Sequence, residues 1–349
     1  MSLVHDIGAR ALHALDPEDA HRLTIMALKA GLGPRARGDD DPILAGEIGG
    51  LSLPNVIGLA PGFDKNAEVF APMLRAGFGF VECGTVTPLA QVGNPRPRLF
   101  RLSADQAVIN RMGFNNDGLD AFAANLASRG AGVVGANIGA NKDSEDRIAD
   151  YVTGLTRLWG LADYFTINIS SPNTPGLRAL QTRAALEDLL GRLAEARERL
   201  PVSGRVPMFL KVAPDLEAGE VEAISDVAAA ARLEAVIVSN TTVSRPDSLR
   251  SPLAGETGGL SGAPLMSLST RMLQDFHVAA AGRFALIGAG GVASGADAYA
   301  KIRAGAGAVQ LYSALVYGGP GLVTAIKRDL AARLRADGFT SVGQAVGAR

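Results

Sequence analysis

Eight short apolar runs, separated by longer stretches with helical periodicity, organise the sequence beyond residue 45. The runs span residues 56–59, 80–83, 133–138, 164–169, 208–212, 235–238, 284–287 and 308–311. Helical patterns such as 184–200, 218–231 and 296–304 lie between them. This alternation predicts an α/β fold built from a (β/α)8 barrel, often called a TIM barrel. The alternative is an open doubly wound sheet, which usually has fewer strands.

Composition and charge exclude several classes of protein. Of the 349 residues, 47% are hydrophobic and 20% are charged, which is incompatible with general disorder. The net charge of −1 argues against broad binding to nucleic acid. Cys83 is the single cysteine, and none of the four histidines follows a predicted strand, so we expect neither a disulfide nor a metal site.

The first forty residues form a separate unit in the sequence. Apolar residues recur at helical spacing over 4–15, and Asp16-Pro17-Glu18-Asp19 is typical of a second helix start. We expect that helix to stop at Gly31, before a polar linker. The predicted domains are therefore a helical hairpin at 1–40 and a catalytic barrel at 41–349. The hairpin either packs on the barrel as an extension or lies on a membrane surface.

Polar residues follow the predicted strands, where a barrel of this type builds its active site. Five asparagines, two lysines and several hydroxyl residues occupy these positions, which suggests a flat ligand with many hydrogen-bonding groups. Backbone N–H groups at Gly290, Gly291, Tyr312 and Ser313 are placed to bind a phosphate. If a proton is transferred, the candidates are Ser170, Ser171, Thr174 or a lysine.

Several long motifs at these positions resemble the dihydroorotate dehydrogenase family. They are A-P-G-F-D-K-N at 60–66, N-P-R-P-R-L-F-R-L at 94–102, I-N-R-M-G-F-N-N at 109–116, N-I-G-A-N-K-D at 137–143, N-I-S-S-P-N-T-P-G-L-R at 168–178, S-N-T-T at 239–242 and G-G-L-S-G at 258–262. The resemblance covers nearly the whole chain. It is closest to the quinone-dependent, membrane-associated class, because of the N-terminal extension and because Ser171 stands where the fumarate-linked members carry a cysteine.

The resemblance implies bound FMN and the oxidation of dihydroorotate to orotate in pyrimidine (UMP) biosynthesis, with Ser171 as the base. It places flavin contacts at Ala60, Pro61, Gly62, Phe63, Asp64, Lys65, Thr85, Asn137, Asn168, Lys211, Ser239, Gly262, Gly291, Tyr312 and Ser313. Substrate contacts are expected at Lys65, Asn110, Arg111, Met112, Gly113, Phe114, Asn168, Asn173, Asn240 and Thr241. Two departures are small: the family commonly has threonine at Ser239 and alanine at Pro61.

The same resemblance gives the N-terminal hairpin a role. It implies that His21 and Arg101 receive the head of a membrane quinone, and that the hairpin binds the lipid surface. The expected location is the cytoplasmic face of a bacterial inner membrane, as a peripheral protein, because the sequence has neither a spanning segment nor a transit peptide. Rival interpretations are a fumarate- or NAD-linked flavin barrel, a dihydrouridine synthase, or a non-catalytic barrel that binds a phosphate ligand.

Overall fold

Eight parallel strands close into a barrel in a computed structural model that describes residues 12–174, 176–201 and 206–348. The strands are β3 (Ile57–Leu59), β4 (Phe80–Val86), β7 (Val133–Ile138), β8 (Tyr164–Asn168), β9 (Met208–Val212), β10 (Ala235–Val238), β12 (Ala285–Ala289) and β13 (Ala308–Leu311). They follow one another around the barrel in chain order, and β13 pairs with β3 to close it. The predicted (β/α)8 barrel is confirmed, since all eight apolar runs become its strands.

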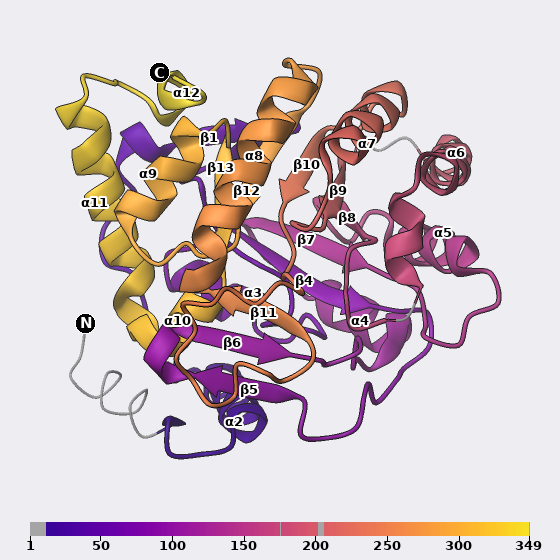
Figure 1. Ribbon diagram of the computed structural model, residues 1–349, viewed down its shortest axis with the longest axis horizontal. Coiled ribbons are helices and arrows are strands. Elements are labelled where there is room, and N and C mark those ends of the chain that lie inside the picture. The colour runs from indigo at the N-terminus through magenta and orange to yellow at the C-terminus, as the bar shows by residue number, and fades with distance from the viewer. Residues whose placement is uncertain (1–11, 175, 202–205, 349) are drawn as a thin grey trace.

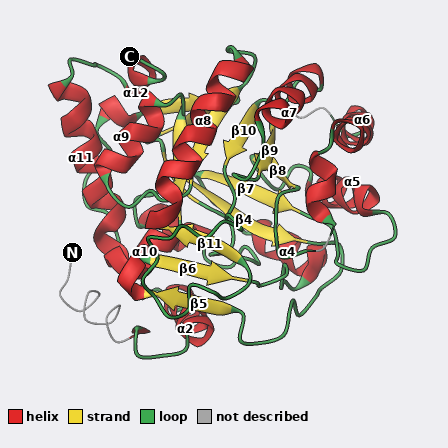
Figure 2. Cartoon of the chain, in the orientation of Figure 1, coloured by secondary structure: helices red, strands yellow, loops and turns green. Residues whose placement is uncertain are grey.

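Helices surround the barrel on the outside, as Figure 1 and Figure 2 show. They are α3 (Phe70–Arg75), α4 (Gly118–Leu126), α5 (Arg147–Leu158), α6 (Arg183–Glu198), α7 (Ala218–Ala230), α8 (Met266–Ala280), α9 (Gly295–Arg303), α10 (Ser313–Gly318), α11 (Leu322–Ala336) and α12 (Val342–Ala345). Their apolar faces cover the strands, and residues such as Leu155, Leu189 and Phe276 are fully buried there. The core therefore lies between the helices and the barrel.

Aromatic side chains plug the amino-terminal end of the barrel. The rings of Tyr164 and Phe209 stack with centroids 4.6 Å apart. A Cβ atom on Gly58 would lie 2.2 Å from Phe80, and one on Gly135 would lie 2.1 Å from Tyr164. These two glycines leave room for the rings. Access to the barrel interior is consequently from the carboxyl ends of the strands.

Two small sheets were absent from the sequence prediction. A β-hairpin joins β1 (Gly46–Ile48) to β2 (Leu51–Leu53), and β5 (Leu99–Leu102), β6 (Ala107–Asn110) and β11 (Gly259–Gly262) form an antiparallel sheet. The second sheet has its own small core, which includes Phe100 and Leu260. Its strands have at most four residues, too few to show a clear alternation. This sheet lies at the mouth of the barrel and forms one wall of the site described below.

Helix α2 (Pro17–Lys29) lies beside β5 (Figure 1). It begins as predicted, because the side chain of Asp16 accepts hydrogen bonds from the N–H groups of Glu18 and Asp19. It ends before Gly31, which has a φ of 81°. The expected first helix falls largely in residues 1–11, outside the described part of the chain. Within the described residues, no helix has the length and hydrophobicity to cross a bilayer.

Candidate active site

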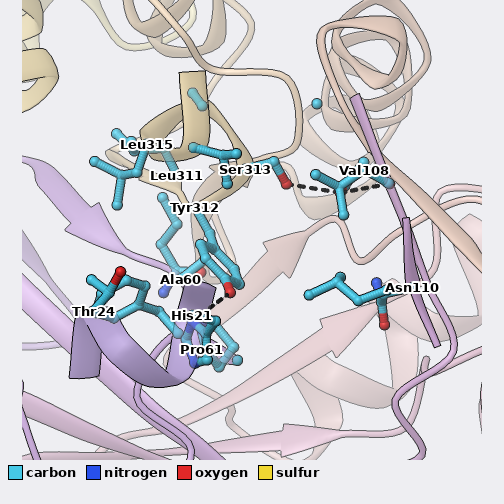
Figure 3. Close-up of a pocket in the computed structure, with 18 of the residues that line it drawn as sticks. His21, Thr24, Ala60, Pro61, Val108, Asn110, Leu311, Tyr312, Ser313 and Leu315 are labelled. Carbon is cyan, nitrogen blue, oxygen red and sulfur yellow. Dashed lines mark hydrogen bonds between the residues drawn. The ribbon is translucent and has the colours of Figure 1, made fainter. Parts of the chain in front are cut away.

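A cavity of about 880 Å³ opens at the carboxyl ends of the barrel strands. This is near the upper end of the range of roughly 300–1,000 Å³ that is usual for ligand pockets. Amide, hydroxyl and lysine side chains line its inner part, and apolar residues of α2, α10 and α11 line its outer part. Figure 3 shows His21 and Thr24 of α2 on one side and Val108 and Asn110 of β6 on the other. The cavity therefore joins the barrel interior to the N-terminal helix.

A chain of hydrogen bonds connects the barrel interior to the inner part of the cavity. Asn137 Nδ2 donates to Glu82 Oε1 at 2.7 Å, and Asn137 Oδ1 accepts from Thr85 Oγ1 at 2.6 Å. Asn168 Nδ2 donates to Thr85 Oγ1 at 2.9 Å, and Asn168 Oδ1 accepts from Asn240 Nδ2 at 3.3 Å. Each amide is thus held in one orientation by its neighbour. The chain fixes which edge of each amide faces the cavity.

Lys211 of β9 projects into the barrel beside Asn168, its partner in the strand register. The side chain is buried, and burial lowers its pKa, opposed by the negative charge of Glu82. Among the described residues, Lys211 Nζ makes no hydrogen bond. A buried ammonium without a hydrogen-bond partner is costly unless a ligand accepts from it. Lys211 is therefore placed to bind an electron-rich edge of a ligand.

The segment after β3 brings Lys65 to the cavity wall. Gly62 has a φ of 98°, a conformation that favours glycine, and its carbonyl accepts a hydrogen bond of 2.9 Å from Lys65 Nζ. Burial lowers the pKa of Lys65 to about 8, although the charge of Glu18 opposes this shift. Lys65 thus faces the cavity as a cation near neutral pH. It is suited to pair with the carboxylate of a ligand.

The turn after β12 has the features of an anion site. Gly290 and Gly291 have φ values of 98° and 83° and line the cavity. A Cβ on Gly291 would lie 2.4 Å from the Cα of Met266, so no side chain fits there. The N–H groups of both glycines lack a hydrogen-bond acceptor among the described residues. Together with Ser313 at the start of α10, they can bind a phosphate group.

Ser171 and three asparagines form the wall opposite α2. Ser171 is buried at the edge of the cavity, and its Oγ accepts a hydrogen bond of 3.3 Å from the N–H of Asn173. Asn173 Nδ2 donates to Asn110 Oδ1 at 3.1 Å, which joins the Ser171 loop to strand β6. Asn240 completes this wall, and its Oδ1 accepts from the N–H of Thr241. The serine hydroxyl and three amides therefore surround one end of the cavity.

Most of the residues predicted for the site line this single cavity, and three do not. Arg111 points away: it pairs with Glu256 at 2.7 Å and stacks over Phe100 at 4.5 Å. It follows Asn110 in an extended segment, where successive side chains alternate between faces. Asn137 lies behind Thr85, as described above. Asp64 lies behind Lys65, where its carboxylate accepts from the N–H groups of Glu68 and Val69 and burial raises its pKa.

His21 lies at the junction of the inner and outer parts of the cavity (Figure 3). Its Nδ1 is 3.4 Å from the hydroxyl of Tyr312, and its ring packs edge-on against Phe63 with centroids 5.4 Å apart. Burial, followed by the charge of Lys65, lowers the pKa of His21 to about 3. The imidazole is therefore neutral at physiological pH. Arg101, also on the wall, donates hydrogen bonds to the backbone carbonyls of Leu12, His13 and Leu15.

An ion pair between α2 and the barrel was not foreseen from the sequence. Both oxygens of the Glu18 carboxylate accept from Arg98, at 2.6 and 3.0 Å, and Arg96 adds a contact at 2.9 Å. Burial raises the pKa of Glu18, but the two arginines outweigh it and leave the pKa below its usual value. Because Arg98 is almost fully buried, the loss of Glu18 would leave a buried charge unpaired. Glu18 therefore joins α2 to the loop before β5.

Comparisons with known proteins identify the family of this chain. The family model described as dihydroorotate dehydrogenase matches residues 43–334. The chain is 56% identical over 338 residues to a protein of Azorhizobium caulinodans named dihydroorotate dehydrogenase (quinone), with 95% of each chain covered. It is 55% identical to the protein of that name from Parvibaculum lavamentivorans, with 97% of each covered. The crystal structure of Eimeria tenella DHODH in complex with ferulenol superposes with a TM-score of 0.93, at 40% identity, covering 97% of this chain and 98% of the other.

Proposed function

The chain belongs to the dihydroorotate dehydrogenase family, and we propose on that basis how its cavity performs the reaction. The enzyme oxidises dihydroorotate to orotate, uses FMN as cofactor and transfers the electrons to a quinone. FMN, when bound, supplies a hydride acceptor that later passes its electrons to the quinone. The observation that carries the assignment is one cavity with two parts, polar inside the barrel and apolar beneath α2.

The residues of the inner cavity fit FMN. The turn at Gly290 and Gly291, with its unpaired N–H groups, suits the phosphate, and Ser313 at the start of α10 adds a donor. Lys211 suits an edge of the flavin ring that gains negative charge on reduction. Thr85, Asn168 and the backbone of 60–63 complete the walls. In this proposal Asn137 and Asp64 brace the flavin site from behind.

Dihydroorotate binds on the wall formed by Asn110, Asn173 and Asn240. Amide side chains can pair with the planar amide edges of the ring, and Lys65 can pair with the carboxylate. Met112, Gly113, Phe114 and Thr241 line the same region. Arg111 does not contact the substrate in this proposal, because it is committed to Glu256.

Ser171 is the base for the C5 proton of dihydroorotate: its Oγ takes up that proton as its own hydroxyl proton passes to water in the cavity. FMN, when bound, would accept the hydride from C6. The support is its position: among the described residues of the 170–174 loop, its hydroxyl is the one that lines the cavity, and it accepts a hydrogen bond from the N–H of Asn173. The neighbouring Ser170 is committed to Asn168 and Asn240 instead. Burial excludes bulk water, which leaves Ser171 as the local proton acceptor.

The quinone enters between α2 and α10 and reaches His21 and Tyr312. Both side chains are uncharged: His21 has a pKa of about 3, and burial raises the pKa of Tyr312. They can donate or accept hydrogen bonds at a quinone oxygen. Arg101 shapes the entrance by holding the backbone of 12–15, rather than presenting a free guanidinium. Apolar residues such as Leu28, Leu315 and Val323 surround the path of the tail.

The N-terminal unit lies on the lipid surface. Leu23, Met26 and Leu32 are 43%, 58% and 68% exposed, which is unusual for large apolar side chains on one short segment. A helix of 13 residues is about 20 Å long, enough to lie in the membrane interface. The enzyme is thus a peripheral membrane protein in this proposal, and we place it on the cytoplasmic face of a bacterial inner membrane.

The decisive experiment uses the purified full-length protein without oxygen. We expect the protein to be yellow, dihydroorotate to bleach the flavin absorbance, and a quinone to restore that absorbance. A colourless folded protein that gains no flavin on reconstitution contradicts the proposal. Fumarate or NAD restoring the colour as fast as quinone would instead identify the rival acceptor classes.

A further inference from the structure

Lys301 of α9 is a fully buried lysine just outside the flavin cavity. Its side chain packs against Gly288, where an added Cβ would lie 3.1 Å from Lys301 Cβ. Among the described residues, no carboxylate lies within ion-pair distance of its ammonium, and its hydrogen bond goes to Ser269 Oγ at 2.6 Å. Burial lowers the pKa of Lys301 to about 7, and the charge of Asp297 opposes this shift, so a further anion near the turn would favour the charged form.

Ser269 connects this lysine to the glycine turn. Its Oγ accepts from Lys301 and has one proton to share among the carbonyls of Gly290 at 2.9 Å, Leu265 at 2.8 Å and Met266 at 3.2 Å. The carbonyl of Gly290 and the N–H of Gly291 belong to the same peptide group. A hydrogen bond to that carbonyl polarises the peptide and makes its N–H a stronger donor. The positive charge therefore acts toward the turn that lines the cavity.

We propose that Lys301 is the buried cation that complements the FMN phosphate, acting through Ser269 and the peptide between Gly290 and Gly291. This inference rests on the proposed phosphate site. Lys301 does not line the cavity and does not touch the ligand, so it is a positioning residue. Asp297 acts on this charge only from beyond ion-pair distance, and we assign the remaining compensation to the phosphate.

A purely structural role for Lys301 makes a different prediction. A lysine that only fills space would affect the whole flavin site equally, whether or not the ligand carries a phosphate. A lysine that complements the phosphate affects FMN and spares riboflavin, which has the same ring and lacks the phosphate. The comparison between the two flavins therefore separates the roles.

The experiment measures flavin release from the full-length holoenzyme after dilution, followed by the fluorescence of the freed flavin. The variants are Lys301→Met, Ser269→Ala and the double substitution, each loaded with FMN or exchanged into riboflavin by dialysis. Lys327→Met on α11 is the matched control, because Lys327 is also largely buried but bonds to Asp40 and the carbonyl of Gly77.

We expect Lys301→Met to release FMN at least about tenfold faster, the effect of losing one charge-assisted interaction, and riboflavin within about twofold of wild type. Ser269→Ala should show a smaller effect that does not add to that of Lys301→Met. Equal acceleration of both flavins, or FMN release no faster than in Lys327→Met, overturns the inference. If riboflavin does not bind to the enzyme, the inference is judged on FMN alone: FMN must leave Lys301→Met faster than it leaves Lys327→Met. Bleaching of the wild-type flavin by dihydroorotate tests the proposed function separately.

Discussion

Glu82 Oε1 accepts a hydrogen bond of 2.7 Å from Asn137 Nδ2, deep inside the barrel. The other partners of Glu82, Gln310 Nε2 at 2.7 Å and the Tyr164 hydroxyl at 3.3 Å, are also donors. An ionised carboxylate, which only accepts, satisfies all three. Its negative charge also faces Lys211. Glu82 therefore determines the orientation of Asn137, and through it the orientation of the amides along the cavity.

Glu82→Gln should disturb both the fold and the flavin. The new amide turns an NH2 group toward one of three donors, which we expect to cost about 1–3 kcal/mol of unfolding free energy. Asn137 should reorient and shift the absorbance of the bound flavin. Thermal unfolding and visible spectra of the holoenzyme measure the two effects. The exposed Glu47→Gln is the control, and spectra identical to that control would refute the assigned role of Glu82.

Orotate binding should weaken as the pH rises above about 8. The pKa of Lys65 is about 8, mainly because of burial, so its charge is present below this pH and lost above it. If the cation pairs with the carboxylate of orotate, as we propose, affinity should be flat below pH 8 and fall about tenfold per pH unit above it, until the higher pKa of the complex is reached. Titrations of orotate into the oxidised enzyme between pH 6 and 10 measure this.

The same titration tests the influence of Glu18 on Lys65. Removing the charge with Glu18→Gln should lower the pKa of Lys65 further, because Glu18 opposes the effect of burial. The pH at which orotate affinity begins to fall should then move to a lower value. Asp19→Asn, on the same helix but more exposed, should leave it in place. An unchanged profile in Glu18→Gln would show that α2 does not act on Lys65.

Ser171→Ala should retain FMN and orotate binding while flavin reduction by dihydroorotate slows by at least about 100-fold, the low end for a lost general base. Stopped-flow absorbance without oxygen measures the reduction. Ser171→Cys should reduce faster than Ser171→Ala, because a thiol can also accept the proton. Reduction at the wild-type rate in the alanine variant would require another base.

Introducing negative charges on the exposed face of α2, and in the segment that follows its C-terminal end, should detach the enzyme from lipid. Met26→Glu with Leu32→Glu places two charges where large apolar side chains face outward. We expect loss of vesicle sedimentation and of most turnover with a long-tailed quinone, with normal flavin reduction by dihydroorotate. Val278→Glu on α8, where the side chain is 77% exposed, is the matched control. Point variants are preferable to deleting residues 1–40, which would also remove Glu18 from Arg98.

The sequence predicted the barrel because its strands are buried on both sides. Such strands appear as unbroken apolar runs, and the run at 133–138 corresponds to the bounds of β7. The strands of the β5–β6–β11 sheet have only four residues each and adjoin polar loops, so they carried no comparable signal. Most of the cavity was predictable for a similar reason, since residues after barrel strands converge at one end.

The side chains behind the cavity wall could not be predicted in the same way. Glu82 stands inside an apolar run, and Lys301 lies in a helix of ordinary amphipathic composition. Their roles depend on which face each presents and on which residue lies opposite. Arg111 shows the converse: it adjoins cavity residues in the chain, yet its side chain lies on the other face. The periodicity of apolar residues predicts helices and strands. Which side chains from distant segments contact one another can be read only from the three-dimensional structure.

The pairing of β3 with β13 has a consequence for synthesis in the cell. These strands come from opposite ends of the barrel sequence, so β3 keeps an unpaired edge until the ribosome has released β13. Such an edge invites pairing with other chains, which makes the nascent barrel a natural substrate for chaperones. The loops that we propose to bind flavin come from both ends as well, so a chain interrupted before residue 311 lacks part of that site. We therefore expect flavin uptake only after β13 and the residues that follow it have been synthesised.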